Sequence, residues 1–275
     1  IYVSDNIGFI YSIDIESGSL IWKKFYGDSF NSKIKIFNNK IYLADKNNKV
    51  QCFKVSDGSK IWEIKTFSTF IKSQNYLPLA ISKEGYVLFI NSAGDLFKIN
   101  SENGSVNWSL PTISGLAAHD TDFFESSDIV IDKNTLFFSN KSSNMFSINL
   151  ESGFINWRNE LKTNIKPIIN GKNIFVLTTN GFLVNLNKYD GKILWSSNTF
   201  KEIKKRKKFL NATGFILGKD TIYITTSDGN LITYLAVSGK IKYLKKVAKS
   251  FTSGPIVSNN KLYILSAQQK LLVFN

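Results

Sequence analysis

The sequence predicts an all-β fold: a β-propeller built from four-stranded antiparallel blades. Three observations predict it. One motif recurs along the whole chain, strand-like runs precede each copy of it, and no apolar pattern with a helical period is sustained. At 43% hydrophobic and 20% charged residues, the chain can bury a core.

The motif is a glycine followed four residues later by an aromatic residue. The six glycines are spaced by about 44 residues on average, the length expected for a propeller blade of four strands. All five tryptophans of the chain lie in the aromatic column, where they are expected to pack between blades. The pairs are Gly18 and Trp22, Gly58 and Trp62, Gly104 and Trp108, Gly153 and Trp157, Gly191 and Trp195, and Gly239 and Tyr243.

Each copy contains the strands of one blade. Before the motif comes a β-branched and aromatic run bounded by turn residues, as in IYLAD from Ile41. A shorter strand precedes that run, as in PLAIS from Pro78 and GPIVS from Gly254. The motif glycine follows Ser or Asp in most copies, as in Ser17-Gly18, Asp57-Gly58 and Asp190-Gly191, and supplies the positive φ of a tight hairpin.

The first and last copies are incomplete. The first copy lacks its innermost strand, and a seventh copy starts at Leu262 and ends before its glycine and aromatic residue. We therefore expect residues 1–275 to form one propeller domain with the N-terminal part of its ring missing. Seven copies are visible, which leaves seven or eight blades open.

The pattern D-x-x-S/T-G-x-x-x-W resembles the repeat of pyrroloquinoline-quinone (PQQ) propellers. Asp14–Trp22 matches it fully, and Asn187–Trp195 follows it with Asn at the first position and Asp at the fourth. That family includes quinoprotein alcohol dehydrogenases and the non-catalytic outer-membrane assembly factor BamB. Similarity to BamB implies a scaffold on the periplasmic side of the outer membrane, held by a lipid anchor upstream of the given sequence. Its implied partner is the core protein of outer-membrane barrel assembly.

A PQQ-dependent dehydrogenase or a PQQ-binding sensor is the alternative, and a propeller hub with another partner is a third hypothesis. Members with the cofactor often carry adjacent cysteines and use arginines around the quinone. Here Cys52 is alone, and only Arg158 and Arg206 are arginines. One Cys and one His exclude a disulfide framework and a multi-histidine metal centre. We predict no catalytic residue, no cofactor and no metal.

Two segments are candidates for binding a partner. The first is the acidic loop around His119, Asp120 and Asp122, which lacks EF-hand spacing; it is interpreted as solvated, with calcium binding left open. The second is the run of Lys204, Lys205, Arg206, Lys207 and Lys208.

Both segments fall in long connections between blades, at 111–127 and 197–212; a third connection spans 66–77. These connections are expected at one end of the propeller, where insertions are typical of a binding surface. The net charge is +14, and most of the excess lies after residue 200. An acidic protein or an anionic membrane surface is the expected partner of the basic run. Nucleic acid is not, because few aromatic residues interleave with the cations.

Overall fold

The computed structural model describes residues 1–66, 76–113, 124–140, 144–201, 203 and 210–274. Within these ranges the regular structure is entirely strand, which confirms the all-β prediction. The described residues contain no helix long and apolar enough to cross a membrane.

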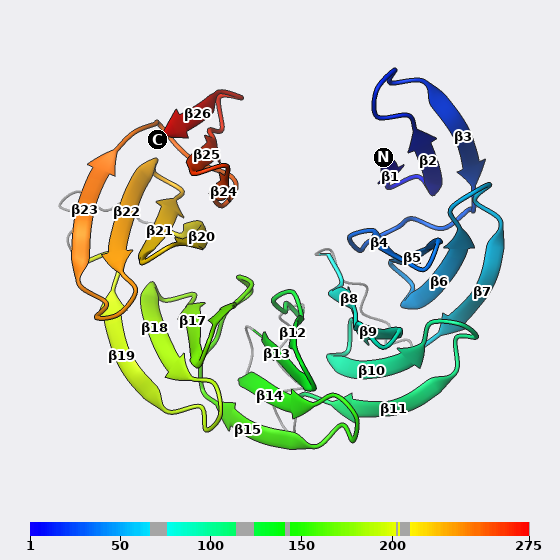
Figure 1. The fold of residues 1–275 in the computed structure, drawn as a ribbon, viewed down its shortest axis with the longest axis horizontal. Coiled ribbons are helices and arrows are strands. Elements are labelled where there is room, and N and C mark those ends of the chain that lie inside the picture. Colours follow the sequence, from blue (N-terminus) through cyan, green and yellow to red (C-terminus); the bar gives the residue numbers. More distant parts are fainter. Residues whose placement is uncertain (67–75, 114–123, 141–143, 202, 204–209, 275) are drawn as a thin grey trace. The chain divides into compact units, whose positions relative to one another are not determined.

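The strands form seven antiparallel sheets, each made of consecutive strands in chain order (Figure 1). The first sheet has three strands, β1 (Tyr2–Ser4), β2 (Phe9–Ile13) and β3 (Leu20–Phe25). The last also has three, β24 (Ile256–Ser258), β25 (Lys261–Leu265) and β26 (Leu271–Phe274). These two sheets lack the strands that the sequence predicted to be missing.

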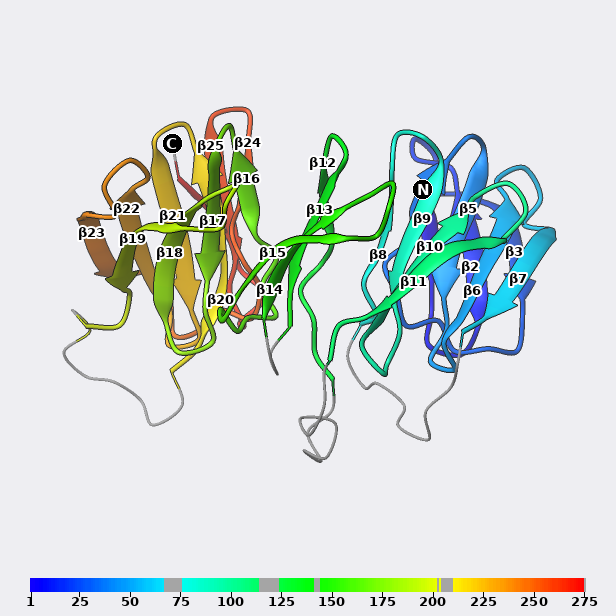
Figure 2. The same cartoon turned by 90° about the horizontal axis from the view of Figure 1, so that it is seen from below.

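The five sheets between them have four strands each, and Figure 2 shows the same strands in side view. The second and third sheets are β4 (Lys35–Phe37), β5 (Lys40–Ala44), β6 (Lys49–Lys54), β7 (Lys60–Lys65), and β8 (Leu79–Ile81), β9 (Tyr86–Ile90), β10 (Asp95–Asn100), β11 (Val106–Pro111). The fourth and fifth are β12 (Val130–Asp132), β13 (Thr135–Ser139), β14 (Met145–Asn149), β15 (Ile155–Asn159), and β16 (Ile168–Asn170), β17 (Asn173–Leu177), β18 (Phe182–Asn187), β19 (Ile193–Asn198). The sixth is β20 (Ala212–Gly218), β21 (Thr221–Thr226), β22 (Asn230–Leu235), β23 (Ile241–Lys246).

The third and fourth strands of a sheet form the hairpin that carries the repeat motif. All six motif glycines have positive φ, between 64° and 76°, as the turn prediction required. The register shifts just before this turn in five sheets, for example between Cys52 and Phe53 and between Asn185 and Leu186. The bulge places the aromatic residue of the motif opposite the residue before the shift, as Trp62 lies opposite Cys52.

The chain divides into two compact units. Unit 1 comprises Ile1–Ser143 with Ile148–Ile155, and unit 2 comprises Asn144–Ser147 with Asn156–Asn275. The middle strands of the sheets are buried on both faces, as the burial of four consecutive residues in β5 shows. In unit 1 one buried cluster packs Tyr42 and Cys52 against Phe89 and Phe97, and in unit 2 another packs Phe175 and Leu183 against Ile222 and Ile232.

Candidate interaction surface

The tryptophans of the repeat pack on the glycines of the following sheet. In unit 1 the Trp62 ring lies so close to Gly104 that a Cβ added there would be 2.8 Å from Trp62 Cε3. The same contact joins Trp22 to Gly58 and Trp108 to Gly153 in unit 1, and Trp157 to Gly191 and Trp195 to Gly239 in unit 2. Only glycine leaves room for the ring at a backbone position with positive φ, so the contact requires both residues of the motif.

Four of the five indoles are also hydrogen-bonded to the sheet that they contact. Each Nε1 donates to the carbonyl oxygen of the residue three positions before the contacted glycine; the distance is 3.0 Å for Trp22 to Val55 and 2.9 Å for Trp62 to Ser101. Trp108 and Trp157 donate in the same way to Leu150 and Lys188. Trp195 departs from this pattern because its buried Nε1 has no acceptor.

The two ends of the series lack this contact among the described residues. No atom lies within 4 Å of the position a Cβ would take on Gly18. At the other end, Tyr243 is 47% exposed. Gly18 therefore presents an open turn, and Tyr243 an aromatic ring without a glycine over it.

The three long connections share a threonine at their start. Thr66, Thr112 and Thr199 each follow the motif tryptophan by four residues, and each is buried. Each donates both its N–H and its Oγ1–H to one carbonyl in the turn between the second and third strands of its own sheet. The Oγ1 distances are 3.0 Å to Asn48, 2.6 Å to Gly94 and 2.7 Å to Gly181. Each long connection thus leaves its sheet at the end that carries this turn.

Apolar residues hold both ends of one of these connections and the beginning of another. In unit 1, Ile113 and Phe124, on either side of residues 114–123, both approach Gly94. A Cβ added to Gly94 would lie 2.8 Å from Ile113 Cδ1 and 2.9 Å from Phe124 Cε2. In unit 2, Phe200 lies against Gly181, and Ile203 belongs to the same buried cluster. These anchors give each connection a fixed origin on its sheet.

The predicted partner-binding residues themselves lie outside the described residues. This holds for His119, Asp120 and Asp122 in the acidic loop, and for Lys204, Lys205, Arg206, Lys207 and Lys208 in the basic run. Of the acidic loop, the structure describes the end: Asp128 forms an ion pair of 2.6 Å with Lys33 in unit 1. No cluster of metal-binding side chains occurs among the residues that the structure describes.

One buried carboxylate lies in the turn where the first long connection is attached. The side chain of Asp45 is fully buried and accepts hydrogen bonds from the N–H groups of Asn47 (2.7 Å) and Lys49 (3.0 Å). Lys49 Nζ lies 3.6 Å from Asp45 and is also paired with Asp28. Burial raises the pKa of Asp45 above its usual value despite these partners.

Cys52 and Arg158 are the residues that the sequence analysis weighed against a quinone cofactor. Cys52 is fully buried in β6, and burial raises the pKa of its thiol to about 12, which disfavours the reactive thiolate. Arg158 is exposed on the outer strand β15.

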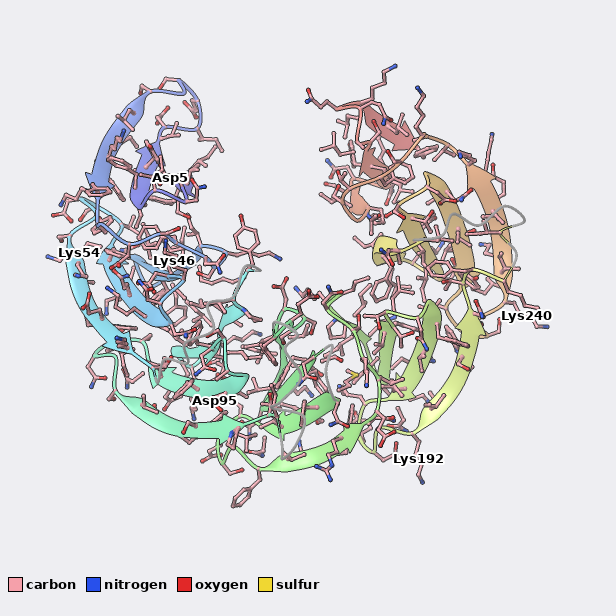
Figure 3. The ribbon with its side chains drawn as sticks, turned by 180° about the vertical axis from the view of Figure 1, so that it is seen from behind. Asp5, Lys46, Lys54, Asp95, Lys192 and Lys240 are labelled. Atoms are coloured by element: carbon pink, nitrogen blue, oxygen red, sulfur yellow. The ribbon has the colours of Figure 1, made fainter. Side chains whose placement is uncertain are left out.

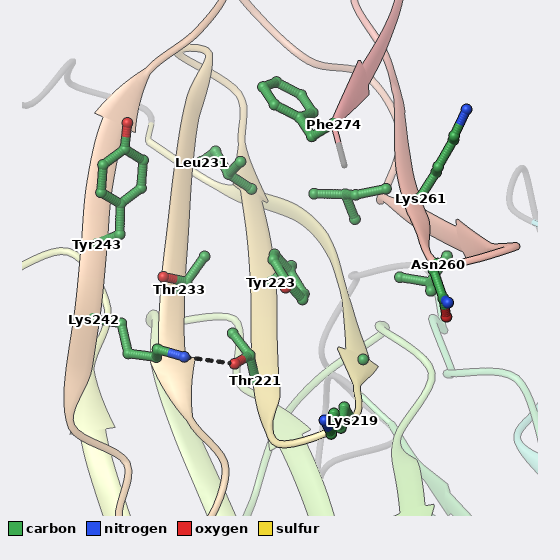
Figure 4. Close-up of a pocket in the computed structure, with 13 residues that line it drawn as sticks. Lys219, Thr221, Tyr223, Leu231, Thr233, Lys242, Tyr243, Asn260, Lys261 and Phe274 are labelled. Carbon is green, nitrogen blue, oxygen red and sulfur yellow. Dashed lines mark hydrogen bonds between the residues drawn. The ribbon is translucent and has the colours of Figure 1, made fainter.

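A cleft of about 500 Å³ lies between the last two sheets, within unit 2 (Figure 4). Its floor contains Leu231 and Leu262, and Lys219 and Lys261 stand at its rim. Lys242 Nζ donates to Thr221 Oγ1 at 3.0 Å on one wall. The lining residues include no carboxylate, histidine or cysteine, so the cleft offers no general acid or base of those kinds.

These features define a class of protein. The consecutive four-stranded sheets, joined by tryptophan on glycine, are those of a β-propeller with PQQ-type repeats. The family model described as "Outer membrane protein assembly factor BamB" matches residues 1–197. The chain therefore belongs to the BamB family.

Individual relatives agree with this assignment. A BamB from Moranella endobia (strain PCIT) is 20% identical over 321 aligned positions, which cover 96% of this chain and 80% of that protein. The crystal structure of BamB from Moraxella catarrhalis superposes with a TM-score of 0.79 at 18% identity, over 99% of this chain and 80% of that one. A europium-containing methanol dehydrogenase has the same fold, with a TM-score of 0.74 at 10% identity over 99% of this chain and 70% of its own.

Proposed function

We propose that this protein is a non-catalytic accessory factor in the assembly of outer-membrane proteins. The observation that carries the proposal is the family match over residues 1–197, supported by a BamB relative aligned with nearly the whole chain. The protein would act in the periplasm at the outer membrane, held there by a lipid anchor outside the given sequence. We also infer that residues 1–275 form a single propeller domain, since one repeat pattern runs through all of them.

The binding surface of this factor would be the end of the sheets from which the long connections leave. Thr66 and Thr112 in unit 1 and Thr199 in unit 2 tie each connection to a buried carbonyl, so these loops start from rigid points. Binding residues are commonly carried by loops on a rigid scaffold. The proposed partner is the core protein of outer-membrane barrel assembly, recognised by the basic run from Lys204 to Lys208 and the acidic loop at His119, Asp120 and Asp122.

Association with the periplasmic repeats of that core protein tests the proposal directly. We expect saturable binding by surface plasmon resonance, with an on-rate that falls when Lys204, Lys205, Arg206, Lys207 and Lys208 are changed to Gln. The decrease should be larger at low salt, because exposed charges are screened over about 8–10 Å at physiological ionic strength. A control changes Lys54 and Lys65, both exposed, to Gln. Absence of binding by the unmodified protein would refute the proposed partner.

The quinoprotein alternative has a separate test. The methanol dehydrogenase likeness concerns the fold alone, because the sequences are 10% identical. PQQ and calcium are added to the protein, and dye-linked alcohol oxidation is measured. We expect neither quinone binding nor oxidation; saturable activity would overturn the non-catalytic assignment.

A further inference from the structure

Two turns of unit 2 expose apolar side chains where the other copies of the repeat are polar. Tyr189 lies in the turn between β18 and β19, and Val237 in the turn between β22 and β23; they are 73% and 84% exposed. Both stand two residues before the motif glycine. The four other copies have Glu16, Ser56, Glu102 and Glu151 at this position. The turn itself therefore does not require an apolar residue there.

The hairpins that carry these two side chains are strongly basic. Segments 188–198 and 236–246 contain six lysines and a single acidic residue, Asp190. Asp190 lies 3.6 Å from Lys192. The equivalent segments of unit 1, 15–25, 55–65 and 101–111, contain four lysines and four acidic residues. Exposed apolar side chains also occur near the motif glycine in two turns of unit 1, at Ile15 (75%) and Phe154 (77%), but in the two hairpins of unit 2 they coincide with excess positive charge.

The two hairpins are in contact. The Trp195 ring of β19 lies against Gly239 in the second turn, and Ser197 Oγ donates to Gly239 O at 2.6 Å. Ile193 and Leu194, at the start of β19, are about half exposed. Lys192 and Lys240 are labelled on these hairpins in Figure 3. We call Tyr189, Lys192, Ile193, Val237 and Lys240 the turn face.

We propose that the turn face docks on the surface of an anionic lipid bilayer. Tyr189 and Val237 would enter the headgroup region, where a tyrosine ring finds both apolar and polar surroundings. Lys192 and Lys240 would remain at the lipid phosphates, with their aliphatic stems along the apolar residues. A protein partner is less favoured, since the apolar side chains protrude on separate turn tips, and protein anchors usually enter pockets at an interface centre.

This inference goes beyond the proposed function and does not depend on it. The turn with Tyr189 lies before β19, and the chain leaves the other end of that strand at Asn198 toward the basic run. Six residues of strand separate these ends by about 20 Å. Membrane contact through the turn face and contact through Lys204 to Lys208 are therefore distinct hypotheses.

Vesicle sedimentation tests the charge and the apolar tips. We expect the full chain to bind phosphatidylcholine vesicles that contain phosphatidylglycerol and not vesicles of phosphatidylcholine alone. Each lysine near such a surface contributes roughly a fivefold change in the partition coefficient, so Lys192→Gln with Lys240→Gln should weaken binding about 25-fold. Tyr189→Ser with Val237→Ser should also weaken it, whereas Lys54→Gln with Lys65→Gln in unit 1 should not.

An environment-sensitive probe tests the geometry in folded protein. In a Cys52→Ser background, single cysteines at Tyr189, Val237 or Glu16 are labelled with nitrobenzoxadiazole; Glu16 is the matched control because it occupies the same turn position. We expect a blue shift with anionic vesicles at positions 189 and 237 and none at 16. No shift at 189 and 237, or an equal shift at 16, overturns the proposal. The proposal is also overturned if vesicle binding is lost when the basic run, residues 204–208, is changed to Gln but is kept in the turn-face variants.

Discussion

Replacing Gly104 with alanine should cost far more stability than replacing Gly18, although both lie at the same place in the repeat. Their φ values are similar, 76° and 70°, so the left-handed backbone costs each alanine about 1–2 kcal/mol. At Gly18 nothing further is lost, because no atom lies within 4 Å of the new Cβ. At Gly104 the Cβ would lie 2.8 Å from Cε3 and 2.9 Å from Cδ2 of Trp62, so the ring must move.

Moving the Trp62 ring breaks its hydrogen bond of 2.9 Å to Ser101 O and opens the packing around it. The lost hydrogen bond contributes about 1 kcal/mol, and the disturbed packing about 1–3 kcal/mol. Gly104→Ala is therefore expected to lower the free energy of unfolding by about 3–6 kcal/mol, and Gly18→Ala by about 1–2 kcal/mol. Urea unfolding followed by far-ultraviolet circular dichroism measures both values.

A double-mutant cycle isolates the contact. Trp62 is half-buried, so Trp62→Ala alone should cost about 3 kcal/mol, at the low end for a large aromatic residue. In that background Gly104→Ala should cost no more than Gly18→Ala, since the ring that it displaces is gone. Equal costs for Gly104→Ala and Gly18→Ala in the unmodified protein would refute the reasoning.

Three further outcomes are expected. Thr199→Val should lower the free energy of unfolding by about 1–2 kcal/mol, because it removes the Oγ1 hydrogen bond and leaves Gly181 O with one donor fewer. Urea unfolding measures this change, and Thr213→Val, the same substitution at a partly exposed site, is the comparison. The Cys52 thiol, with its pKa raised to about 12, should not react with a maleimide at pH 8 until the protein is unfolded in urea, and rapid labelling of native protein would contradict its burial. Burial raises the folded-state pKa of Asp45 above 3.8, so the stability linked to its protonation is present below that pH and lost as the pH rises through the folded pKa. Asp45→Asn, which keeps an acceptor for the turn, should therefore reduce the loss of stability on raising the pH from acid to neutral, and an unchanged pH profile would show that Lys49 already compensates the charge.

The fold could be predicted from the sequence because the two residues of its repeated contact, glycine and tryptophan, recur at fixed positions in the repeat. The incomplete first and last sheets followed from the same alignment. The threonines at the roots of the long connections were also visible, four residues after Trp62, Trp108 and Trp195, yet their meaning required the carbonyl that each one bonds.

Other features depend on neighbours that no spacing reveals. Lys98 occupies the strand position that holds Cys52 or Ser12 in other copies, and it is 5% exposed. Its Nζ lies 3.9 Å from the centre of the Tyr86 ring and forms a cation–π contact with it. Lys98 lies in β10 and Tyr86 in the neighbouring strand β9 of the same sheet. The register bulge before the motif turn of five sheets and the missing acceptor of Trp195 Nε1 were likewise not predictable, because both depend on backbone geometry. For the candidate binding loops, the sequence located the segments, and the structure adds where they are attached.

The contact between tryptophan and glycine has a consequence for how such a protein changes over evolutionary time. From the second copy to the fifth, each copy carries one half of the contact for the copy before it and the other half for the copy after it, as Gly58 and Trp62 do. A duplicated segment of about 44 residues therefore brings a glycine for the tryptophan of the copy before it and a tryptophan for the glycine of the copy after it. Stability in such arrays is close to a sum of units and nearest-neighbour terms. Gain or loss of a blade by duplication or deletion would leave every remaining tryptophan–glycine contact unchanged. A point substitution at one glycine instead damages a contact without removing the two copies that it connects.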